Sequence, residues 1–369
     1  MGLTTELAAA YAGKRVFLTG HTGFKGSWAA LWLHRLGAQV TGLALPPNTD
    51  PAMFHLCGVA GLVDHYLGDI RDAALVRKRL VAAEPDIVFH LAAQPIVRQS
   101  YIDPLETMAT NVMGTAHVLE AVRAAARPMA VVVVSSDKCY DNRGWVWGYR
   151  ENDAMGGSDP YSASKGATEL VTTSWRDSFF GPDSGVRLAS ARAGNVIGGG
   201  DWAADRVVPD CVRSFCAGRR VELRNPRATR PWQHVLEPLG GYLLLGAKLM
   251  AAEGRDYCSG WNFGPAAQDV RPVEELVEAM ARHWGASAQW DKSSGPHPKE
   301  AAVLSLNCDK AVGQLGWAPT WSLDTMIGHT ARWYRAWYDG GQDLQALSFR
   351  QIEDFVTTAD RMMPRVGDC

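Results

Sequence analysis

The chain has 369 residues, of which 47% are apolar and 21% charged, and its formal net charge is −2. That balance is typical of a folded globular protein, and it excludes a general electrostatic attraction for nucleic acid. No apolar run reaches the roughly 18 residues that a membrane-spanning helix needs, and no signal-peptide pattern precedes Gly20. We therefore expect a cytoplasmic protein with no membrane or nucleic-acid partner.

Cysteine and histidine spacing predicts no metal site. The seven cysteines include no Cys-x-x-Cys pair, and the ten histidines include no His-x-x-x-His pair. These are common ligand spacings, so their lack argues against bound metal. An odd number of scattered cysteines in a chain of this length is typical of reduced thiols.

The first half of the chain alternates short β-branched segments with helical ones. Strands are predicted at 15–19, 39–43, 62–67, 86–91 and 129–134, and helices at 26–36, 72–82 and 103–126. Residues 131–134 are all valine, apolar on both faces as in a central parallel strand. This alternation predicts an α/β fold, a Rossmann-type doubly wound parallel sheet.

After about residue 190 the pattern loosens into shorter elements. Glycine and proline pairs interrupt it, and tryptophans become frequent. We expect a smaller mixed α/β C-terminal domain that shares a cleft with the sheet, with most of its tryptophans in the core.

A glycine-rich turn follows the first predicted strand. Gly20, Gly23 and Gly26 form Gly-x-x-Gly-x-x-Gly where a helix begins. Such a turn lets a pyrophosphate approach the helix N-terminus, where free N–H groups favour anions. The alternative is an ordinary strand-to-helix turn. The predicted cofactor-binding residues here are Gly20, Thr22, Gly23, Phe24, Lys25 and Gly26; Lys25 either contacts phosphate or is solvated.

The cofactor prediction is NAD rather than NADP. The ribose-binding acid expected about 20 residues after the turn would fall near Ala44-Leu45-Pro46, where neither a carboxylate nor an arginine stands. Asp69 and Ile70, after the third strand, are candidates for the adenine. A helix N-cap is the alternative role for Asp69.

A Tyr-x-x-x-Lys pair, Tyr161 and Lys165, follows a proline that suits a helix start. Four-residue spacing places both side chains on one helix face. A free tyrosine has a pKa of about 10, so a phenolate at neutral pH requires about three units of lowering, or roughly 4 kcal/mol. Lys165 and the nicotinamide cation are expected to supply it. Ser135 and Ser136 end the fifth strand, at the usual ligand crevice.

These motifs together resemble the extended short-chain dehydrogenase/reductase family, in the branch that handles sugar nucleotides. The stretches 90–94, 111–115 and 192–196 fall where that branch has its motifs. The resemblance implies that Ser136, Tyr161 and Lys165 are catalytic, and that Leu91, Ala92, Ala93 and Ser135 join Tyr161 and Lys165 at the cofactor. It also implies a dinucleotide-binding domain at 1–190 with 233–262, and a sugar-nucleotide-binding domain at 191–232 with 263–369.

The pair after Ser136 is similar to the CDP-glucose 4,6-dehydratase group of this family. Asp137-Lys138 stands where other 4,6-dehydratases commonly have Asp-Glu, and epimerases generally lack such a pair. Residues 20–28 and 230–236 also resemble the CDP-glucose 4,6-dehydratase group. The resemblance implies oxidation at C4 of CDP-glucose, loss of water across C5 and C6 with Asp137 as acid and a base at C5, and return of the hydride to C6. Lys138 is either that base or an ion-pair partner that positions Asp137; turn capping is the alternative for Asp137.

Further residues are expected to bind the substrate. Asn195, Arg206 and Arg230 match family positions at the nucleotide diphosphate; the alternative for each arginine is a solvated surface charge. Weaker candidates are Gln94, Arg98, Arg224, His297 and Glu300. His90 is expected to be structural.

By the same resemblance, helices near 103–126 and 160–180 would pair two copies into a homodimer. The helix near 103–126 has one apolar face, formed by Val112, Ala116, Leu119 and Val122. That face fits a dimer interface and burial within the chain equally well.

The resemblance also implies a place in deoxysugar biosynthesis, such as that of lipopolysaccharide O-antigen. Two alternatives remain: a nucleotide-sugar epimerase or reductase of the same fold, and a non-catalytic dinucleotide-sensing protein.

Overall fold

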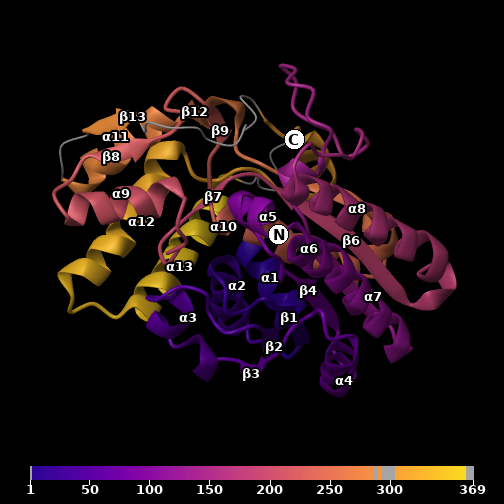
Figure 1. Cartoon of the computed structure of the whole chain (residues 1–369). Helices are drawn as coiled ribbons and strands as arrows, with labels where there is room; N and C mark the ends of the chain where they lie inside the picture. The colour runs from indigo at the N-terminus through magenta and orange to yellow at the C-terminus, as the bar shows by residue number, and fades with distance from the viewer. Residues whose placement is uncertain (1, 286–288, 293–303, 363–369) are drawn as a thin grey trace, which may run out of the picture.

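A seven-stranded sheet organises the chain in the computed structural model, which describes residues 2–285, 289–292 and 304–362. The strand order is β11-β6-β5-β4-β1-β2-β3, and every pairing is parallel. The chain builds outward from β1 to β3 and then returns to build the other half from β4. This confirms the predicted doubly wound sheet (Figure 1). The strands are β1 (Arg15–Thr19), β2 (Gln39–Ala44), β3 (Asp64–Leu67), β4 (Ile87–His90), β5 (Met129–Val134), β6 (Val186–Ala193) and β11 (Gly260–Phe263).

The predicted elements differ from the observed ones mainly at their ends. β3 begins at Asp64 instead of 62, because a 3-10 turn at Val59–Gly61 leads into it. The helix predicted at 103–126 is interrupted: α6 (Pro104–Met108) passes through a π-helical turn, Ala109–Met113, into α7 (Gly114–Ala125). Apolar periodicity continues through such a turn, so the sequence pattern did not reveal it.

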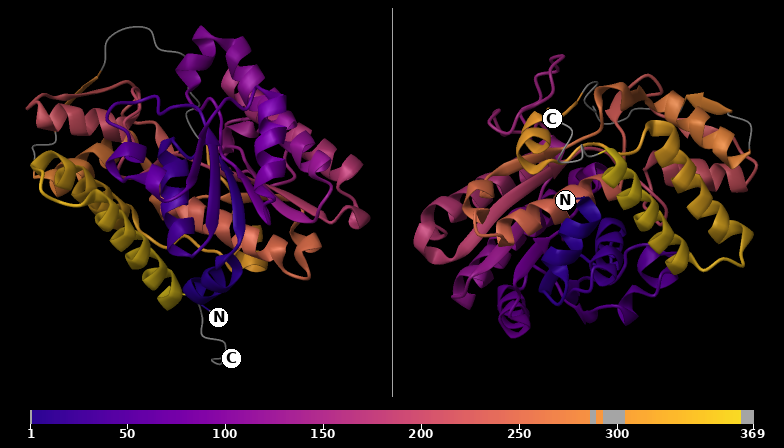
Figure 2. Two further views of the ribbon diagram at one scale, coloured as in Figure 1. Left: turned by 90° about the horizontal axis from the view of Figure 1, so that it is seen from below. Right: turned by 180° about the vertical axis from the view of Figure 1, so that it is seen from behind.

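Helices cover both faces of the sheet. One layer holds α1 (Leu3–Tyr11), α2 (Phe24–Arg35) and α10 (Leu236–Met250); the other holds α4 (Ala73–Ala83), α7 and α8 (Pro160–Phe179). Side chains of each strand alternate between the two cores, so that Val16 and Leu18 face the first and Phe17 the second. The layers are visible in Figure 2.

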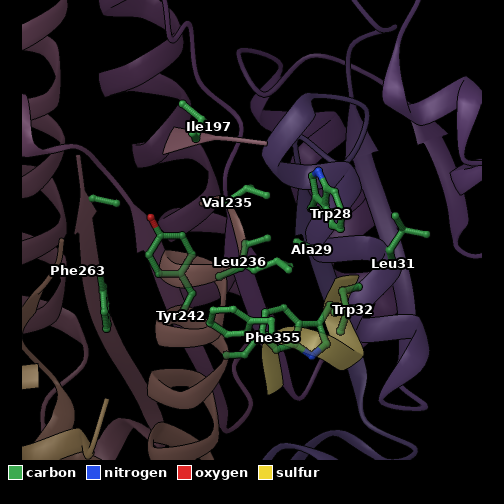
Figure 3. Close-up of a cluster of buried hydrophobic side chains, with 14 of the residues drawn as sticks. Trp28, Ala29, Leu31, Trp32, Ile197, Val235, Leu236, Tyr242, Phe263 and Phe355 are labelled. Atoms are coloured by element: carbon green, nitrogen blue, oxygen red, sulfur yellow. The ribbon is translucent and has the colours of Figure 1, made fainter. Parts of the chain in front are cut away.

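The first core is rich in large aromatic side chains. Figure 3 shows Trp28 and Trp32 of α2 beside Tyr242 of α10 and Phe355 of α13 (Leu344–Met362). The rings of Trp32 and Phe355 meet edge to face, 5.7 Å between centroids. This contact holds α13 against the sheet layer. Six tryptophans of the second half are buried, as expected: 202, 232, 261, 317, 321 and 333.

A second lobe lies beside the carboxyl ends of the strands (Figure 1). Its strands form three separate two-stranded pairs, β10-β7, β12-β9 and β13-β8. Its helices are α9 (Val207–Cys216), α11 (Val273–Trp284) and α12 (Leu323–Asp339). The short strands are β7 (Val196–Ile197), β8 (Val221–Leu223), β9 (Thr229–Pro231), β10 (Gln233–His234), β12 (Val270–Pro272) and β13 (Trp290–Lys292). None of the described helices has both the length and the apolar character to cross a membrane.

A buried ion pair ties α8 to the sheet. Glu169 of α8 and Arg192 of β6 are both buried, with Oε2 and Nη2 2.9 Å apart. Glu169 also accepts hydrogen bonds from Ser135 and Ser190, and Arg192 donates to the Tyr140 hydroxyl at 2.6 Å. Although burial raises the pKa of Glu169, the Arg192 guanidinium and these hydrogen bonds hold it below its ordinary value. The carboxylate is therefore charged and fully partnered.

Removing one partner of this pair should destabilise the fold. In Arg192→Met, the Glu169 charge stays buried without its cation, so we expect a loss of about 3–5 kcal/mol in the free energy of unfolding. Equilibrium unfolding in urea measures this loss, provided that the dependence of the unfolding free energy on urea concentration is the same in both proteins. The double variant Arg192→Met/Glu169→Gln should recover part of the loss, because no charge then remains buried. A single-variant loss below about 1 kcal/mol would contradict the argument.

Candidate functional site

A cavity of about 580 Å³ lies at the carboxyl ends of the central strands, with walls from both lobes. Parallel sheets of this kind form a crevice where the chain reverses direction, here between β1 and β4. The predicted cofactor-binding residues all line this cavity: Gly20, Thr22, Gly23, Phe24, Lys25, Gly26, Asp69, Ile70, Leu91, Ala92, Ala93, Ser135, Tyr161 and Lys165.

The glycine-rich turn needs its glycines for close backbone approach. Gly20 has φ +79°, and a Cβ there would lie 2.8 Å from Ala92 N. A Cβ on Gly26 would lie 2.0 Å from Gly20 O. The turn therefore packs tightly against β4 and brings the N-terminus of α2 to the cavity wall, so that the backbone there can receive an anion.

The far end of the cavity carries Asp69 and Ile70. The Asp69 carboxylate accepts from Arg71 N and from Arg71 Nε, each at 2.8 Å, and these contacts hold its pKa below the ordinary value. The N-cap of α4 is Asp72, whose side chain accepts from Leu75 N. The alternative N-cap role for Asp69 is therefore wrong. Asn48 and Thr49, which the sequence analysis did not single out, also line the wall near Ala44-Leu45-Pro46.

The serine, tyrosine and lysine of the predicted catalytic set meet at one wall. Ser136 follows the end of β5, and Tyr161 and Lys165 lie in the first two turns of α8, which Asp159 caps through Ser162 N with Pro160 in its first turn. Ser136, Tyr161 and Lys165 all line the cavity. His90 lies beneath them, hydrogen-bonded to Thr19 and Thr115 and fully buried, which fits the structural role expected for it.

Burial is the largest influence on the ionisation of Tyr161. Burial raises the pKa of Tyr161 above its ordinary value, and the opposing contacts with Lys138 and Ser136 do not reverse that shift. Burial also lowers the pKa of Lys165 to about 8, with Glu169 limiting the fall. In the chain's own groups desolvation outweighs the nearby cations. The lowering expected from Lys165 together with the nicotinamide cation stays a prediction.

Asp137 lies directly behind the wall that Ser136 and Lys138 form. Its Oδ1 accepts from Ser136 Oγ at 2.9 Å and from Lys138 Nζ at 3.2 Å. Its Oδ2 is buried and has no hydrogen-bond partner within the described chain. The cap of this short turn is Ser136, which accepts from Lys138 N, so the alternative of turn capping by Asp137 is wrong.

Lys138 has two partners in this state. Besides the ion pair with Asp137, its Nζ donates to Asn195 Oδ1 at 3.2 Å. The ion pair that the sequence analysis weighed against a base role is thus present, and the amine lies on the cavity wall.

Lys25 lies near the catalytic residues. Its Nζ donates to the Tyr242 hydroxyl of α10 at 3.3 Å. Burial lowers the pKa of Lys25 to about 7, and repulsion from Lys165 and Arg206 adds to the effect. The alternative of a solvated lysine is therefore wrong. Tyr242 is fully buried and was missed, since nothing in a helix of mostly apolar residues marks one tyrosine as reaching the site.

The predicted substrate-binding residues divide into two groups. Asn195, Arg206, Arg224 and Arg230 line the cavity. Arg206 pairs with the buried Asp201 at 2.8 Å, and Arg224 donates to Asp205 O at 3.0 Å. Arg230 donates to Thr229 O at 2.9 Å.

Gln94 is the exception among them. It does not line the cavity; its Nε2 donates to Thr107 Oγ1 at 2.9 Å, and its Oε1 accepts from Ile96 N. This corrects its assignment to the substrate, because its side chain is used in holding the loop before α5 (Val97–Ile102). Arg98 pairs with Asp205 at 2.8 Å. His297 and Glu300 lie outside the described residues.

No metal ligand set is found among residues 2–285, 289–292 and 304–362: no group of three or more His, Cys, Asp or Glu side chains there could hold an ion.

Comparisons with known proteins agree with this geometry. A family model described as GDP-mannose 4,6 dehydratase matches residues 17–330. A CDP-glucose 4,6-dehydratase of Salmonella typhimurium is 51% identical over 355 residues, which cover 95% of this chain and 98% of that protein.

Solved structures share the fold. An epimerase from Methanothermobacter thermautotrophicus superposes with a TM-score of 0.78 at 23% identity, covering 91% of this chain and 96% of its own. A dTDP-glucose 4,6-dehydratase from Bacillus anthracis, solved in complex with NAD, gives 0.71 at 19% identity, covering 89% and 99%. The match to the family model and the 51% identical relative place the sequence more narrowly, and the chain belongs to the GDP-mannose 4,6-dehydratase family of extended short-chain dehydrogenases/reductases.

Proposed function

We propose that the protein is an NAD-dependent 4,6-dehydratase, a hydro-lyase, that converts CDP-glucose into CDP-4-dehydro-6-deoxyglucose and water. The observation that carries the proposal is the cluster of Ser136, Lys138 and Tyr161 at one wall of the cavity, with Asp137 hydrogen-bonded directly behind Ser136 and Lys138. The 51% identical relative is named a CDP-glucose 4,6-dehydratase, which supports this substrate over other sugar nucleotides.

The turn at Gly20 and the N-terminus of α2 fit a dinucleotide. The backbone at Gly20 leaves no space for a side chain, which is the form of a pyrophosphate cradle. Asp69, with Ile70, lies where the adenosine half would reach, and no basic residue lies at 44–49 to favour a 2′-phosphate. When bound, NAD⁺ supplies a hydride acceptor for the C4 hydrogen and a donor for C6.

The chain's own residues move the protons. Tyr161 accepts the proton of the sugar 4-hydroxyl, and Lys165 positions Tyr161 and the cofactor from the next turn of α8. The 4-ketone acidifies the hydrogen at C5. Once the Lys138 ammonium has passed its proton to Asp137 across their 3.2 Å contact, the neutral amine removes the C5 proton and later returns it. Asp137 protonates the departing 6-hydroxyl. The 3.2 Å contact between Asp137 and Lys138 supports this assignment, because an acid and a base that act on adjacent carbons must lie close together.

Arginines and an amide are proposed to hold the nucleotide diphosphate. Arg206, Arg224 and Arg230 line the cavity on the side of the second lobe, with Asn195 beside Lys138. A guanidinium group can donate two parallel hydrogen bonds to two oxygens of one phosphate.

On this basis we assign the sugar nucleotide to residues 191–232 and 263–369, and the dinucleotide to residues 1–190 with 233–262. In support, α10 packs on the sheet while β8, β9, β12 and β13 form pairs of their own.

A homodimer is part of the proposal. Large apolar side chains stand exposed on α6, the π-helical turn and α8: Leu105 is 81% and Leu170 62% exposed, and Met113 and Phe179 are about half exposed. Leu119 and Val122, by contrast, are buried within the chain's own core. Exposed apolar residues on neighbouring helices are typical of a helix-paired interface.

We also propose a cytoplasmic location, because cysteines stay reduced there and the six described cysteines form no disulfide. The proposed reaction would serve deoxysugar biosynthesis, such as that for lipopolysaccharide O-antigen.

Incubation of the protein with CDP-glucose and NAD⁺, followed by proton NMR, tests the reaction. We expect a new methyl doublet from C6 with no net accumulation of NADH, because the hydride returns to the product. dTDP-glucose and GDP-glucose, run in parallel, test the nucleobase and should turn over at least about tenfold more slowly, a difference of roughly 1.4 kcal/mol. A changed configuration at C4 or C2 without a methyl signal would instead identify an epimerase.

The role of Lys138 is tested by Lys138→Arg. Arginine keeps a cation beside Asp137 but stays charged at any working pH, so it cannot act as a base. We expect turnover to fall at least about 100-fold, with NADH absorbance building up after C4 oxidation. Tyr161→Phe is the matched control and should form no NADH. If Lys138→Arg turns over at the wild-type rate, Lys138 only positions Asp137.

The homodimer is tested by sedimentation velocity of Leu105→Glu/Leu170→Glu. Charges at both positions should convert the dimer to a monomer, since a buried unpaired carboxylate is costly. Val312→Glu, at another exposed apolar residue, is the control and should leave the dimer intact. A double variant that stays dimeric would exclude these helices as the interface.

A further inference from the structure

The proposed acid and base lie on one short turn, residues 136–140 (the catalytic turn), which ends in a tyrosine. Tyr140 is 1% exposed and does not line the cavity. Its hydroxyl accepts a hydrogen bond from Arg192 Nη1 at 2.6 Å and donates one to Asn262 Oδ1 at 2.7 Å. Burial raises the pKa of Tyr140, so the hydroxyl keeps the hydrogen that it donates.

The two partners of this hydroxyl are fixed by the sheet. Asn262 of β11 lies opposite Arg192 of β6 in the parallel register, so the two side chains are neighbours. Asn262 is fully buried, and its Nδ2 donates to Tyr149 O at 2.9 Å and to Asn307 O at 3.1 Å. An amide whose oxygen and nitrogen are both bonded cannot turn over without losing a partner. The hydroxyl of Tyr140 is therefore anchored to two strands at one edge of the sheet.

Arg192 divides its terminal nitrogens between two parts of the site. Its Nη2 pairs with Glu169 of α8, the helix that carries Tyr161, at 2.9 Å. Its Nη1 bonds to Tyr140 and also donates to Glu151 O at 3.0 Å. Loss of the Tyr140 hydroxyl would leave α8 paired with Arg192, and Nη1 would still have an acceptor. The end of the catalytic turn, by contrast, would lose its polar anchor.

Lys138 depends on such an anchor because its own side chain is held only at its tip. Its Nζ lies 3.2 Å from Asp137 Oδ1 and 3.2 Å from Asn195 Oδ1, and its side chain is 30% exposed. The position of the amine is therefore set largely by the backbone of the catalytic turn. A displacement of about 1 Å at a reacting group can lower a rate by about 100-fold.

We propose that Tyr140 is a positioning residue for the loss of water, because its anchored hydroxyl holds Asp137 and Lys138 in register with C5 and C6 of the sugar. The inference rests on the proposed dehydration, and it gives Tyr140 no contact with substrate and no part in proton transfer. Oxidation at C4 depends instead on residues of α8, which keep their own partners when the hydroxyl is absent. Tyr140 therefore acts on the second step of the reaction and not on the first.

Tyr140→Phe tests this division between the steps. The variant keeps the ring, which stacks on Tyr149 with 5.2 Å between centroids, and removes only the hydroxyl. In a single turnover of CDP-glucose with NAD⁺, NADH absorbance should rise at a rate within about twofold of wild type, because C4 oxidation is intact. The decay of NADH and the formation of the C6 methyl product should be about tenfold slower, so that NADH accumulates.

Tyr149→Phe is the matched control, since it removes the hydroxyl from the other ring of the stacked pair. That hydroxyl accepts from Arg143 N at 2.7 Å and donates to Asn142 Oδ1 at 3.0 Å, and neither partner lines the cavity. Both steps should stay within about twofold of wild type in this variant. NADH binding, followed by its fluorescence, should be unchanged in each variant, which shows that the site is folded.

Asn262→Ser provides a second variant. It removes the acceptor of the hydrogen bond but leaves the Tyr140 hydroxyl on Arg192, and it should also accumulate NADH. If Tyr140→Phe does not fold, Asn262→Ser decides the question. Equal slowing of both steps, or decay of NADH at the wild-type rate, overturns the positioning role. Failure of the wild type itself to dehydrate CDP-glucose would overturn the proposed function instead.

Discussion

The hydrogen bond from Ser136 to the buried carboxylate of Asp137 is the contact around which the site is organised. It links a residue on the cavity wall to one just behind it. Three constraints meet at this serine: it follows closely on the end of β5, caps the short turn after it, and lines the cavity wall. A small hydroxyl side chain satisfies all three.

The fold keeps this contact in place through a second, deeper layer. Glu169 lies one turn after Lys165 on α8 and bonds to Ser135, next to Ser136 in the chain. Arg192 fixes Glu169 from β6. Glu169 therefore joins α8, which carries Tyr161, both to β6 and to the residue before Ser136, and neither Glu169 nor Arg192 lines the cavity. The cost of burying those charges is offset by hydrogen bonds to every side of the carboxylate, which favours a single arrangement of the two elements.

Sequence reasoning located most of the fold and the wall of the cavity because those features depend on local pattern. Strands 15–19 and 129–134 are bounded by composition alone, and the three glycines mark the turn. It failed where the outcome depended on packing. Gln94 was assigned to the substrate but bonds to α6, and the upward shift in the pKa of Tyr161 depends on how deeply its side chain is buried. No spacing rule contains that depth.

The distribution of charge gives the cavity its preference for anions. Lys25 and Lys165 have no carboxylate within ion-pair distance in the described part of the chain. Burial lowers their pKa values to about 7 and about 8, with repulsion from Lys165 and Arg206 adding to the shift of Lys25. A diphosphate entering the cavity supplies the missing negative charge, and an opposite charge nearby favours the protonated lysine. Binding of an anion and uptake of protons by these lysines are thus linked. Asp137, the carboxylate that the chemistry needs, lies behind Ser136 and Lys138 instead of on the wall, so it does not repel the ligand that the lysines attract.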